Sequence, residues 1–504
     1  MTHLKKGIAA ALSLTMVLGL TACQSAQGNA AGTEGALKET QGQAAETENK
    51  DSARAVKAEN VMEKHASGDD ASGEKVELTF WARASSADNN QTITMDEFNA
   101  SQDRIHVTVE CYGDNYEEVL KLACNSGEVP DIFEISGLSD VKSYIDAGLA
   151  YPMDEYLTEE LKAEFNPSAF TKYAYDGQVY AIPHMTRYIR VYYNRDLFEK
   201  AGLDPDNFPT TLEGMYDAAK AITEAGNGEF YGFGFPIKSG STWERNIDDI
   251  AILSGLTGPY GFDYTTGKFD FSKQKPIIEY FAKMYEDGIM MPGSESIDIE
   301  VLRANFIANK VGMYFDGNWM VNGYNNEIEG GDVTNWDTAL VPVFEGTERA
   351  KDYLMLESGH CISSSSEHPA EAFEAISYLL HNVYSAPARK DASKVAPSLS
   401  LIDKDNAEIN ASPEVQKLKG IKGLSMDTEN LSSFTVTPHS ALTLEGDSRD
   451  TVYPLLIIQG SSMDMDAELD KLSETYNSAL ENAVSEGLLE EKDLKPEGFD
   501  YYTR

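Results

Sequence analysis

Hydrophobic and polar positions between residues 76 and 148 change repeatedly between a two-residue period and a helical period. Val76–Trp81 and Ile105–Cys111 alternate apolar and polar side chains, which predicts two strands with one buried face each. Asp131–Ile135 predicts a third, short strand. The expected helices between and after them are Thr92–Ala100, Tyr116–Asn125 (ending near Gly127) and a helix from Ser139 to Gly148. Strands that alternate with helices indicate βαβ units, a largely parallel sheet and an α/β fold.

Residues 175–203 predict an unusual series of extended segments. Asp176-Gly177 is a turn pair between two runs rich in β-branched and aromatic residues. We expect Pro183 to break the strand ladder, because proline lacks a backbone donor, before a second extended run over residues 188–193. A short helix should follow, with Gly202 in the left-handed position that ends helices.

Two later helices have clear start signals. Thr210–Glu213 has the form of a capping box, and apolar side chains follow it at helical spacing. Pro369 precedes another amphipathic run and suits the first position of a helix. No internal repeat is visible.

The first 22 residues have the pattern of a bacterial lipoprotein signal peptide. Two lysines precede a short apolar core, and Leu20-Thr-Ala-Cys23 resembles a lipobox in which the Cys23 thiol carries the lipid. The alternative is an ordinary cleaved signal peptide with a chance cysteine. No later run approaches the length of a spanning helix. We therefore expect export and a lipid (palmitate-type) anchor on the extracellular face of a cell membrane, as in Gram-positive bacteria.

Residues 23–75 are expected to form the lipidated Cys23 and the disordered tether that follows it. They are mainly small, polar and charged, and have almost nothing to bury. A chain of this length reaches about 40 Å from its anchor.

The net charge argues against nucleic-acid binding, and the absence of common catalytic motifs argues against an enzyme. With 41 basic and 83 acidic residues, the net charge of −42 should repel nucleic acid. The chain has no H-E-x-x-H, G-x-S-x-G or P-loop motif, and Gly232-Phe-Gly234 lacks the third glycine of a dinucleotide fingerprint. A glycoside hydrolase remains an alternative, because two of the 83 acidic residues could lie at the spacing that glycoside hydrolysis requires.

Neither a metal nor a cofactor is expected. Beyond Cys23, the cysteines are Cys111, Cys124 and Cys361, and their spacing does not suit zinc. A Cys111–Cys124 disulfide is one interpretation, and buried free thiols are the favoured one. His184 and His360 are expected to be structural, since no second ligand stands at metal-binding spacing.

Residues 175–203 and several other segments resemble the extracellular solute-binding proteins of bacterial sugar ABC transporters (family 1). The matching segments stand in the order of that family: Ser126–Ile132, Tyr144–Asp154, Phe208–Met215, Asn309–Trp319, Trp336 with Leu340–Pro342, and Gly359–Ser363 with Glu367–Ala372. The C-terminal third matches more loosely, and residues 390–450 resemble nothing specific.

This resemblance implies a two-lobed, type II periplasmic-binding-protein-like fold with a cleft between lobes that are joined by crossing segments. The first lobe would comprise residues 76–187 and 343–388, and the second 188–342 and 389–504. The implied function is a monomeric binding protein that captures a carbohydrate, in particular an oligosaccharide, and delivers it to a membrane permease. A surface glycoside hydrolase and a protein that presents its ligand to a membrane sensor are the alternatives.

Sugar sites combine aromatic faces with planar polar side chains. Trp319 is expected at an exposed turn, where its ring can bind a sugar. Trp81 is expected at the end of the first strand and Trp243 in a polar loop. Each of these two could equally well pack in a core. Trp336 is assigned to the core. The other ligand-binding candidates are Arg83, Asp88, Glu134, Ser136, Arg187, Tyr188, Asp316 (or a turn cap), Glu357 and Ser358.

Two arginines and three apolar residues near the crossing are assigned other roles. Arg190 and Arg195 are expected to be solvated or paired with surface carboxylates. Val191, Tyr193 and Phe198 are assigned to packing.

Overall fold

The structure, a computed structural model, describes residues 75–83, 90–113, 116–126, 128–135, 141–327, 335–383, 418–420, 423–424, 431–432, 434 and 436–503. All of them belong to one compact unit, Met62–Arg504. Cys23, the signal peptide and the tether lie outside the described residues, as do Asp88 and Ser136. Within the described part, no helix combines the length and apolar character needed to cross a bilayer.

The first sheet has the strand order β2-β1-β3-β15-β4, and β7 also pairs with β15. Its strands are β1 (Val76–Arg83), β2 (Ile105–Tyr112), β3 (Ile132–Ile135), β4 (Ala150–Tyr151), β7 (Ala181–Arg187) and β15 (Met355–Ser363). The strands β1, β2 and β3 are parallel, as the alternation with helices predicted, whereas β15 is antiparallel to its neighbours. The sheet is therefore mixed, because a distant segment inserts between β3 and β4.

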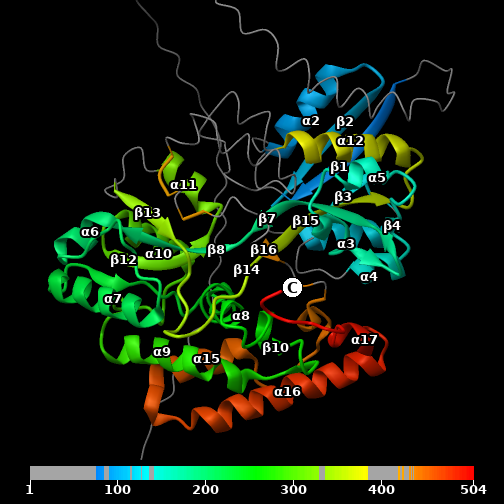
Figure 1. The fold of residues 1–504 in the computed structure, drawn as a ribbon. Coiled ribbons are helices and arrows are strands. Elements are labelled where there is room, and N and C mark those ends of the chain that lie inside the picture. Colours follow the sequence, from blue (N-terminus) through cyan, green and yellow to red (C-terminus); the bar gives the residue numbers. More distant parts are fainter. Residues whose placement is uncertain are drawn as a thin grey trace, which may run out of the picture. The chain divides into compact units, whose positions relative to one another are not determined.

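Helices cover both faces of this sheet (Figure 1). They are α2 (Asn90–Ser101), α3 (Tyr116–Ser126), α4 (Val141–Asp146), α5 (Glu159–Lys162) and α12 (Pro369–Asn382). Leu78, Phe80 and Ala82 of β1 are buried in one hydrophobic cluster with residues of α2 and α12. Phe133 of β3 lies in another cluster with residues of α3. Pro369 occupies the first turn of α12, which confirms that prediction.

The second sheet has the order β13-β8-β12-β9. Its strands are β8 (Ile189–Asn194), β9 (Tyr231–Phe233), β12 (Val311–Gly317) and β13 (Trp336–Ala339), and the helices α6 (Arg195–Lys200), α7 (Leu212–Gly226), α10 (Ile299–Ile307) and α11 (Met320–Glu327) accompany it. Every residue of β8 and β12 is buried. Trp336 is 2% exposed, and Val191, Tyr193 and Phe198 are buried too, which confirms their assignment to packing.

The chain passes from the first sheet to the second between β7 and β8, with only Tyr188 between the two strands. The predicted hairpin is present: β5 (Ala174–Tyr175) and β6 (Gln178–Val179) are joined by Asp176 and Gly177, both with positive φ. The prediction that Pro183 breaks the ladder is wrong. Pro183 lies inside β7 and pairs with Gly359 of β15. The strand tolerates it because a β-ladder does not need a donor from every residue.

Helix ends near the crossing follow local sequence closely. Gly202 has φ +76°, its N–H bonds to Glu199, and the N–H of Leu203 bonds to Phe198, which confirms the predicted left-handed cap of α6. The capping box before α7 is shifted by one residue. Thr211 is the N-cap and accepts from the Gly214 N–H, and Glu213 instead accepts from the backbone N–H of Glu345.

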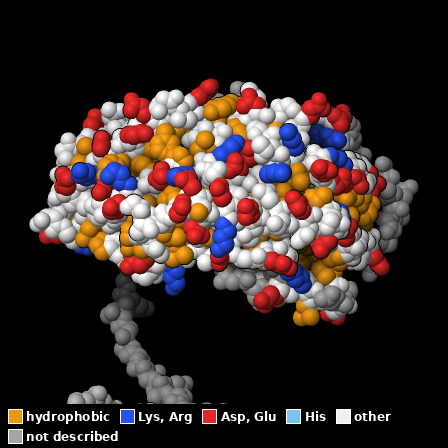
Figure 2. All heavy atoms as spheres, turned by 90° about the horizontal axis from the view of Figure 1, so that it is seen from below, with side chains coloured by type: hydrophobic (Ala, Val, Ile, Leu, Met, Phe, Trp, Pro, Cys, Tyr) orange, Lys and Arg blue, Asp and Glu red, His pale blue; other side chains and the backbone are white. Residues whose placement is uncertain are grey.

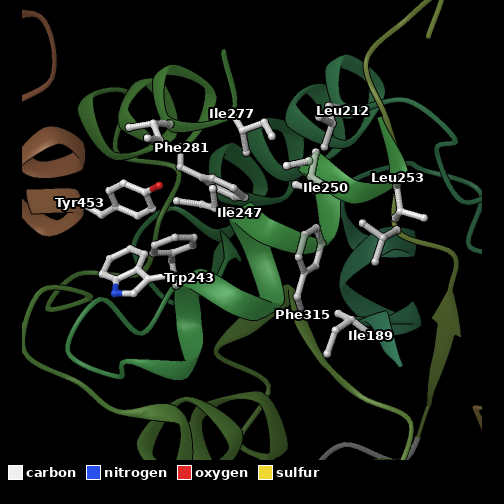
Figure 3. Packing of buried hydrophobic residues seen from close by; sticks show 14 of the residues in the cluster. Ile189, Leu212, Trp243, Ile247, Ile250, Leu253, Ile277, Phe281, Phe315 and Tyr453 are labelled. Carbon is white, nitrogen blue, oxygen red and sulfur yellow. The ribbon is translucent and has the colours of Figure 1, made fainter. Parts of the chain in front are cut away.

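Helices from the middle and the end of the chain complete the core around the second sheet. They are α8 (Asp249–Leu253), α9 (Lys275–Glu286), α15 (Arg449–Gln459), α16 (Met465–Ser485) and α17 (Glu491–Leu494). The remaining strands form two pairs, β10 (Phe262–Asp263) with β11 (Lys268–Phe269) and β14 (Asp352–Tyr353) with β16 (Leu431–Ser432). Tyr453 of α15 packs against Trp243, and Ile277 and Phe281 of α9 belong to the same cluster (Figure 3). The lobe boundaries predicted from the sequence stay predictions.

Arg190 of β8 is buried rather than solvated, which corrects that expectation. Its guanidinium pairs with Asp352 at 3.0 Å, and Arg349 pairs with the same carboxylate at 2.6 Å. Burial alone would raise the pKa of Asp352, but the charges of the two arginines outweigh it and lower the pKa. Arg195 has the expected surface partner, Asp206, at 2.6 Å.

Replacing Asp352 with Asn should lower the free energy of unfolding by about 3–5 kcal/mol, because the buried Arg190 loses its charged partner. Urea unfolding at neutral pH measures this change. The control is Asp206→Asn, since the side chain of Asp206 is 70% exposed and its ion pair should contribute about 1 kcal/mol or less. Equal effects of the two substitutions would contradict the assignment.

Candidate functional site

The turn after β12 is hydrogen-bonded to the crossing between the two sheets. The backbone N–H of Asn318 donates to the Tyr188 carbonyl at 3.0 Å. The Tyr188 N–H donates to the side-chain oxygen of Asn318 at 3.2 Å, and the Asn318 amide donates to the Thr186 carbonyl at 3.4 Å. Asn318 is 1% exposed. These bonds fix the position of the next residue, Trp319, relative to the end of β7.

Trp319 is partly exposed, as expected, and its indole ring lies against Gly317. A Cβ atom at Gly317 would come within 1.8 Å of the ring, so this packing requires glycine. The guanidinium of Arg187, at the end of β7, lies over the ring with its central carbon 4.8 Å from the ring centroid. The guanidinium of Arg245 lies over the same ring at 5.7 Å. The structure therefore brings together the predicted Arg187 and Trp319, and adds Arg245.

The carboxylate of Asp316 is fully buried beneath this turn. Arg303 binds it with two nitrogens, at 2.8 and 3.0 Å, and the Gly317 N–H donates to it at 2.8 Å. Arg245 Nε lies 3.6 Å from the same carboxylate. Both oxygens are engaged within the protein, and the contact with Gly317 is the turn cap that the sequence left open. We therefore do not carry Asp316 into the ligand-binding set proposed below.

A second group of predicted residues lies at the ends of β1 and β3. Trp81 does not end β1, which continues to Arg83; its partly exposed ring packs 4.9 Å from that of Tyr112. The buried carboxylate of Glu134 accepts from the Arg83 backbone N–H and from the Gln91 amide, the latter at 2.7 Å. Glu134 thus ties the end of β1 to the start of α2. Its backbone also bonds at both polar atoms to the Tyr116 hydroxyl, at 2.8 Å each.

Burial raises the pKa of Glu134 to about 7, although the hydrogen bonds from Arg83 and Gln91 act in the opposite direction. His360 Nε2 lies 3.7 Å from the carboxylate, and the His360 ring packs against Phe80 at 5.4 Å. His360 is fully buried, which agrees with a structural role. In the described ranges, no group of three or more His, Cys, Asp or Glu side chains could hold a metal ion.

Two predicted ligand-binding residues are buried. Trp243 is 1% exposed and packs on Phe235 and Tyr453, so it takes the packing alternative. Its loop looks polar, but the apolar partner Tyr453 comes from a helix more than 200 residues later. Tyr188 is 0% exposed, with the Arg190 guanidinium 4.4 Å from its ring centroid. Both side chains therefore lie away from solvent in this structure.

The remaining candidates are placed only in part. Glu357 and Ser358 lie in β15, where the backbone of Glu357 pairs with Met185, and their side chains lie outside the described residues. Cys111, Cys124 and Cys361 are free thiols, which confirms the free-thiol part of the favoured interpretation and excludes the disulfide in this structure. Of the three, only Cys361 is fully buried, and burial raises the pKa of its thiol.

Sequence reasoning missed four residues of these two groups: Gln91, Arg245, Arg303 and Asn318. Their partners lie on other elements, and Asn318 in particular bonds to residues about 130 positions earlier. The turn sequence Asp316–Trp319 was the one available signal, since it placed Asn318 inside a predicted turn.

Comparison with known proteins agrees with this arrangement of two sheets joined by a crossing. Residues 85–384 match the family model described as bacterial extracellular solute-binding protein. The chain belongs to that family. Proteins of this family carry solutes and do not transform them.

Relatives and solved structures support the fold of this solute-binding protein. The chain is 26% identical to a maltotriose-binding protein of Pyrococcus abyssi over 205 residues, and this alignment covers 41% of each protein. The cyclic alpha-maltosyl-1,6-maltose binding protein of Arthrobacter globiformis superposes with a TM-score of 0.63 at 18% identity, over 81% of this chain and 100% of the other. The sugar-binding protein MalE of Xanthomonas citri gives 0.62 at 17%, over 82% and 100%. These likenesses confirm the α/β, type II periplasmic-binding-protein-like fold.

Because the folded pKa of Glu134 is about 7 and its ordinary value 4.5, the protonated form stabilises the folded state. This contribution is complete below pH 4.5 and is lost as the pH rises through about 7. It amounts to about 3 kcal/mol. Glu134→Gln should remove this pH dependence. The unfolding free energy of the wild type minus that of the variant should therefore fall by that amount as the pH rises.

Urea unfolding of wild type and variant between about pH 4 and about pH 8 measures this difference in unfolding free energy. Glu77→Gln is the matched control, because Glu77 is an exposed glutamate of β1. A difference between wild type and Glu134→Gln that does not vary with pH would contradict the raised pKa.

Proposed function

We propose that this chain is the solute-binding subunit of an ABC importer and that it captures a carbohydrate. The observation that carries the proposal is the partly exposed indole of Trp319, fixed at the crossing beside Arg187. Family membership supports the carrier role, and the names of the relatives support a sugar as the ligand. The match spans only 41% of the maltotriose-binding protein, so activity, substrate and partners are all proposed here.

The side chains around Trp319 suit the chemistry of a sugar. An aromatic ring contacts the C–H face of a pyranose and contributes about 0.5–1.5 kcal/mol beyond the buried area. Arginine donates several hydrogen bonds in one plane, which matches neighbouring hydroxyl groups. Trp81 and Arg83, at the end of β1, offer a second ring and a second guanidinium from the other sheet. A ligand that contacts both groups would bridge the two sheets.

Such bridging is a mechanism for transport. A ligand that binds the closed arrangement of the lobes more tightly shifts the population toward it, by the difference in affinity for the two states. The closed form would then dock on a membrane permease, which releases the ligand. An affinity near micromolar, about −8 kcal/mol, suits capture followed by release.

Localisation follows from the N-terminal residues. We propose that residues 1–22 are removed, that Cys23 carries the lipid, and that residues 24–75 tether a monomeric binding protein to the extracellular face of the membrane. The support is the sequence pattern alone, together with an extracellular family.

Trp319→Ala should weaken binding of the transported sugar at least tenfold, whereas Trp319→Phe should retain part of the affinity, because a smaller ring still stacks. Trp81→Ala should also weaken binding. Isothermal titration calorimetry of folded variants measures both effects. The control is Arg104→Gln, about half exposed at the surface.

Unchanged affinity in Trp319→Ala and Trp81→Ala would remove these residues from the site. Release of free sugar from oligosaccharides by the purified protein would favour a glycoside hydrolase instead of a carrier.

Cys23→Ser should abolish incorporation of labelled palmitate and move the protein from the membrane fraction to the medium. Cys111→Ser is the control, since its thiol lies in the folded part of the chain. Retention of the label in the Cys23 variant would contradict the lipobox assignment.

A further inference from the structure

Arg245 connects two segments that leave the second sheet at the same edge. The strands β9 and β12 are parallel neighbours, so the chain continues after each of them from the carboxyl edge of that sheet. The loop after β9 leads to the helical turn Trp243–Asp248, which contains Arg245, and the turn after β12 contains Trp319. Ligands of open α/β sheets bind outside the carboxyl ends of the strands. A contact between these two segments therefore lies where a ligand is expected to bind.

The helical turn Trp243–Asp248 is anchored in the core at both ends. Trp243 is 1% exposed, and its ring packs on that of Tyr453 (Figure 3). Asp248 is also 1% exposed, and Arg449 pairs with it at 2.5 Å. The turn has the wide π-helical geometry, a rare form that occurs often at functional sites. Arg245 therefore extends from a backbone that is held in place.

The guanidinium of Arg245 contacts both the loop after β9 and the turn after β12. Its Nη1 donates to the Ser241 hydroxyl at 2.8 Å, and that hydroxyl lies 2.9 Å from the hydroxyl of Ser239. Its Nε lies 3.6 Å from the buried carboxylate of Asp316. Its central carbon lies 5.7 Å from the centroid of the Trp319 ring. The side chain of Arg245 is only 13% exposed, so these neighbours restrict its movement.

The charges next to Arg245 are balanced within the protein. Arg303 binds both oxygens of Asp316, at 2.8 and 3.0 Å, and also pairs with Glu300 at 2.6 Å. Arg245 and Arg303 thus share two carboxylates, and Arg245 does not require a charged ligand. Asp316 also keeps both bonds from Arg303 when Arg245 is replaced by a neutral residue. The contact of Arg245 that remains to be explained is the one with the indole ring.

Backbone hydrogen bonds fix the turn after β12, but they do not set the orientation of the indole. The Tyr192 hydroxyl donates to the Gly317 carbonyl at 2.6 Å, and Asn318 bonds to Tyr188. These bonds hold main-chain atoms, whereas a tryptophan ring turns about its side-chain torsions. The orientation of the Trp319 ring therefore depends on the groups packed against it, which include the Gly317 backbone and the guanidinium groups over the ring.

We propose that Arg245 is a positioning residue of the ligand site: its guanidinium, braced by Ser241, holds the Trp319 ring in the orientation that contacts a sugar. This inference rests on the carbohydrate-binding function proposed above. A cation over an indole face is attracted by the ring, and a planar guanidinium also stacks on it. A ring that is already ordered loses less conformational freedom when a ligand arrives, so this preorganisation raises the affinity.

The alternative is that Arg245 contacts the ligand directly. The two roles differ in their dependence on the indole. A residue that acts through Trp319 has no effect on affinity once that ring is removed, whereas a residue that touches the ligand keeps its effect. A double-mutant cycle measures this coupling.

The experiment first screens maltotriose, cellotriose and xylotriose by thermal shift with the whole protein, and calorimetry then uses a sugar that binds. Affinities are measured for wild type, Arg245→Gln, Trp319→Ala and the double variant, and also for Arg245→Lys and Ser241→Ala. The control is Arg104→Gln, because the side chain of Arg104 is 51% exposed. On the surface shown in Figure 2, basic side chains lie among many acidic ones, and such exposed pairs contribute little.

Arg245→Gln should weaken binding by about three- to tenfold, but by less than about twofold when Trp319 is already alanine. Arg245→Lys should recover part of the loss, because an ammonium group still attracts the ring. Ser241→Ala removes the brace and should cause a smaller loss, again only when the ring is present. It leaves Arg245 in place and serves as the test if Arg245→Gln does not fold. Arg104→Gln should not change the affinity.

The ring can also be observed without a ligand. Near-ultraviolet circular dichroism reports aromatic side chains that are held in fixed packing. The spectrum of each protein minus that of the same protein with Trp319→Phe isolates the signal of Trp319. Arg245→Gln should reduce this signal, because the ring becomes free to turn, and Arg104→Gln should leave it unchanged.

An equal loss of affinity from Arg245→Gln with and without the Trp319 ring would overturn the inference and show that Arg245 contacts the ligand. An unchanged Trp319 signal in folded Arg245→Gln protein would overturn it too, whether or not a sugar binds. If no saccharide binds the wild type, the proposed carbohydrate-binding function fails. The dichroism signal alone then decides whether Arg245 holds the ring.

Discussion

The reciprocal hydrogen bonds between Tyr188 and Asn318 are the constraint on which the candidate site depends. Tyr188 is the single residue between β7, which belongs to the first sheet, and β8, which belongs to the second. Asn318 follows β12, and its backbone and side chain bond to both polar backbone atoms of Tyr188. Arg187 and Trp319 are the next residues on either side of this pair. Their contact at 4.8 Å therefore follows from the bonds that join the turn to the crossing.

Much of the fold could be predicted from the sequence, because its signals are local. The alternation in Val76–Trp81, the Asp176-Gly177 turn and the glycine after α6 each act within a few residues, and all three appear in the structure. The antiparallel insertion of β15 between β3 and β4 was not predicted, since it pairs segments more than 200 residues apart. Pro183 was misjudged for the same reason: its effect depended on which strand lay beside it.

The arrangement of the candidate site was predictable only where a residue stood in a recognisable turn or crossing. Trp319 and Arg187 met that condition. Trp243 did not, because the ring of Tyr453, which helps to bury it, belongs to the C-terminal helices. Arg245 lies two residues after Trp243 and had no motif of its own. Its importance appears only when Asp316, Arg303 and Trp319 are seen around it.

The different depths of the tryptophans have a spectroscopic consequence. Of the four in the chain, Trp243 and Trp336 are at most 2% exposed. Trp81, in β1, and Trp319, in the turn after β12, are partly exposed. A soluble collisional quencher of fluorescence therefore reaches the latter two, and the deep pair contributes a steady background emission. The protein thus contains its own optical reporters, placed in the two groups of residues that we propose contact the ligand.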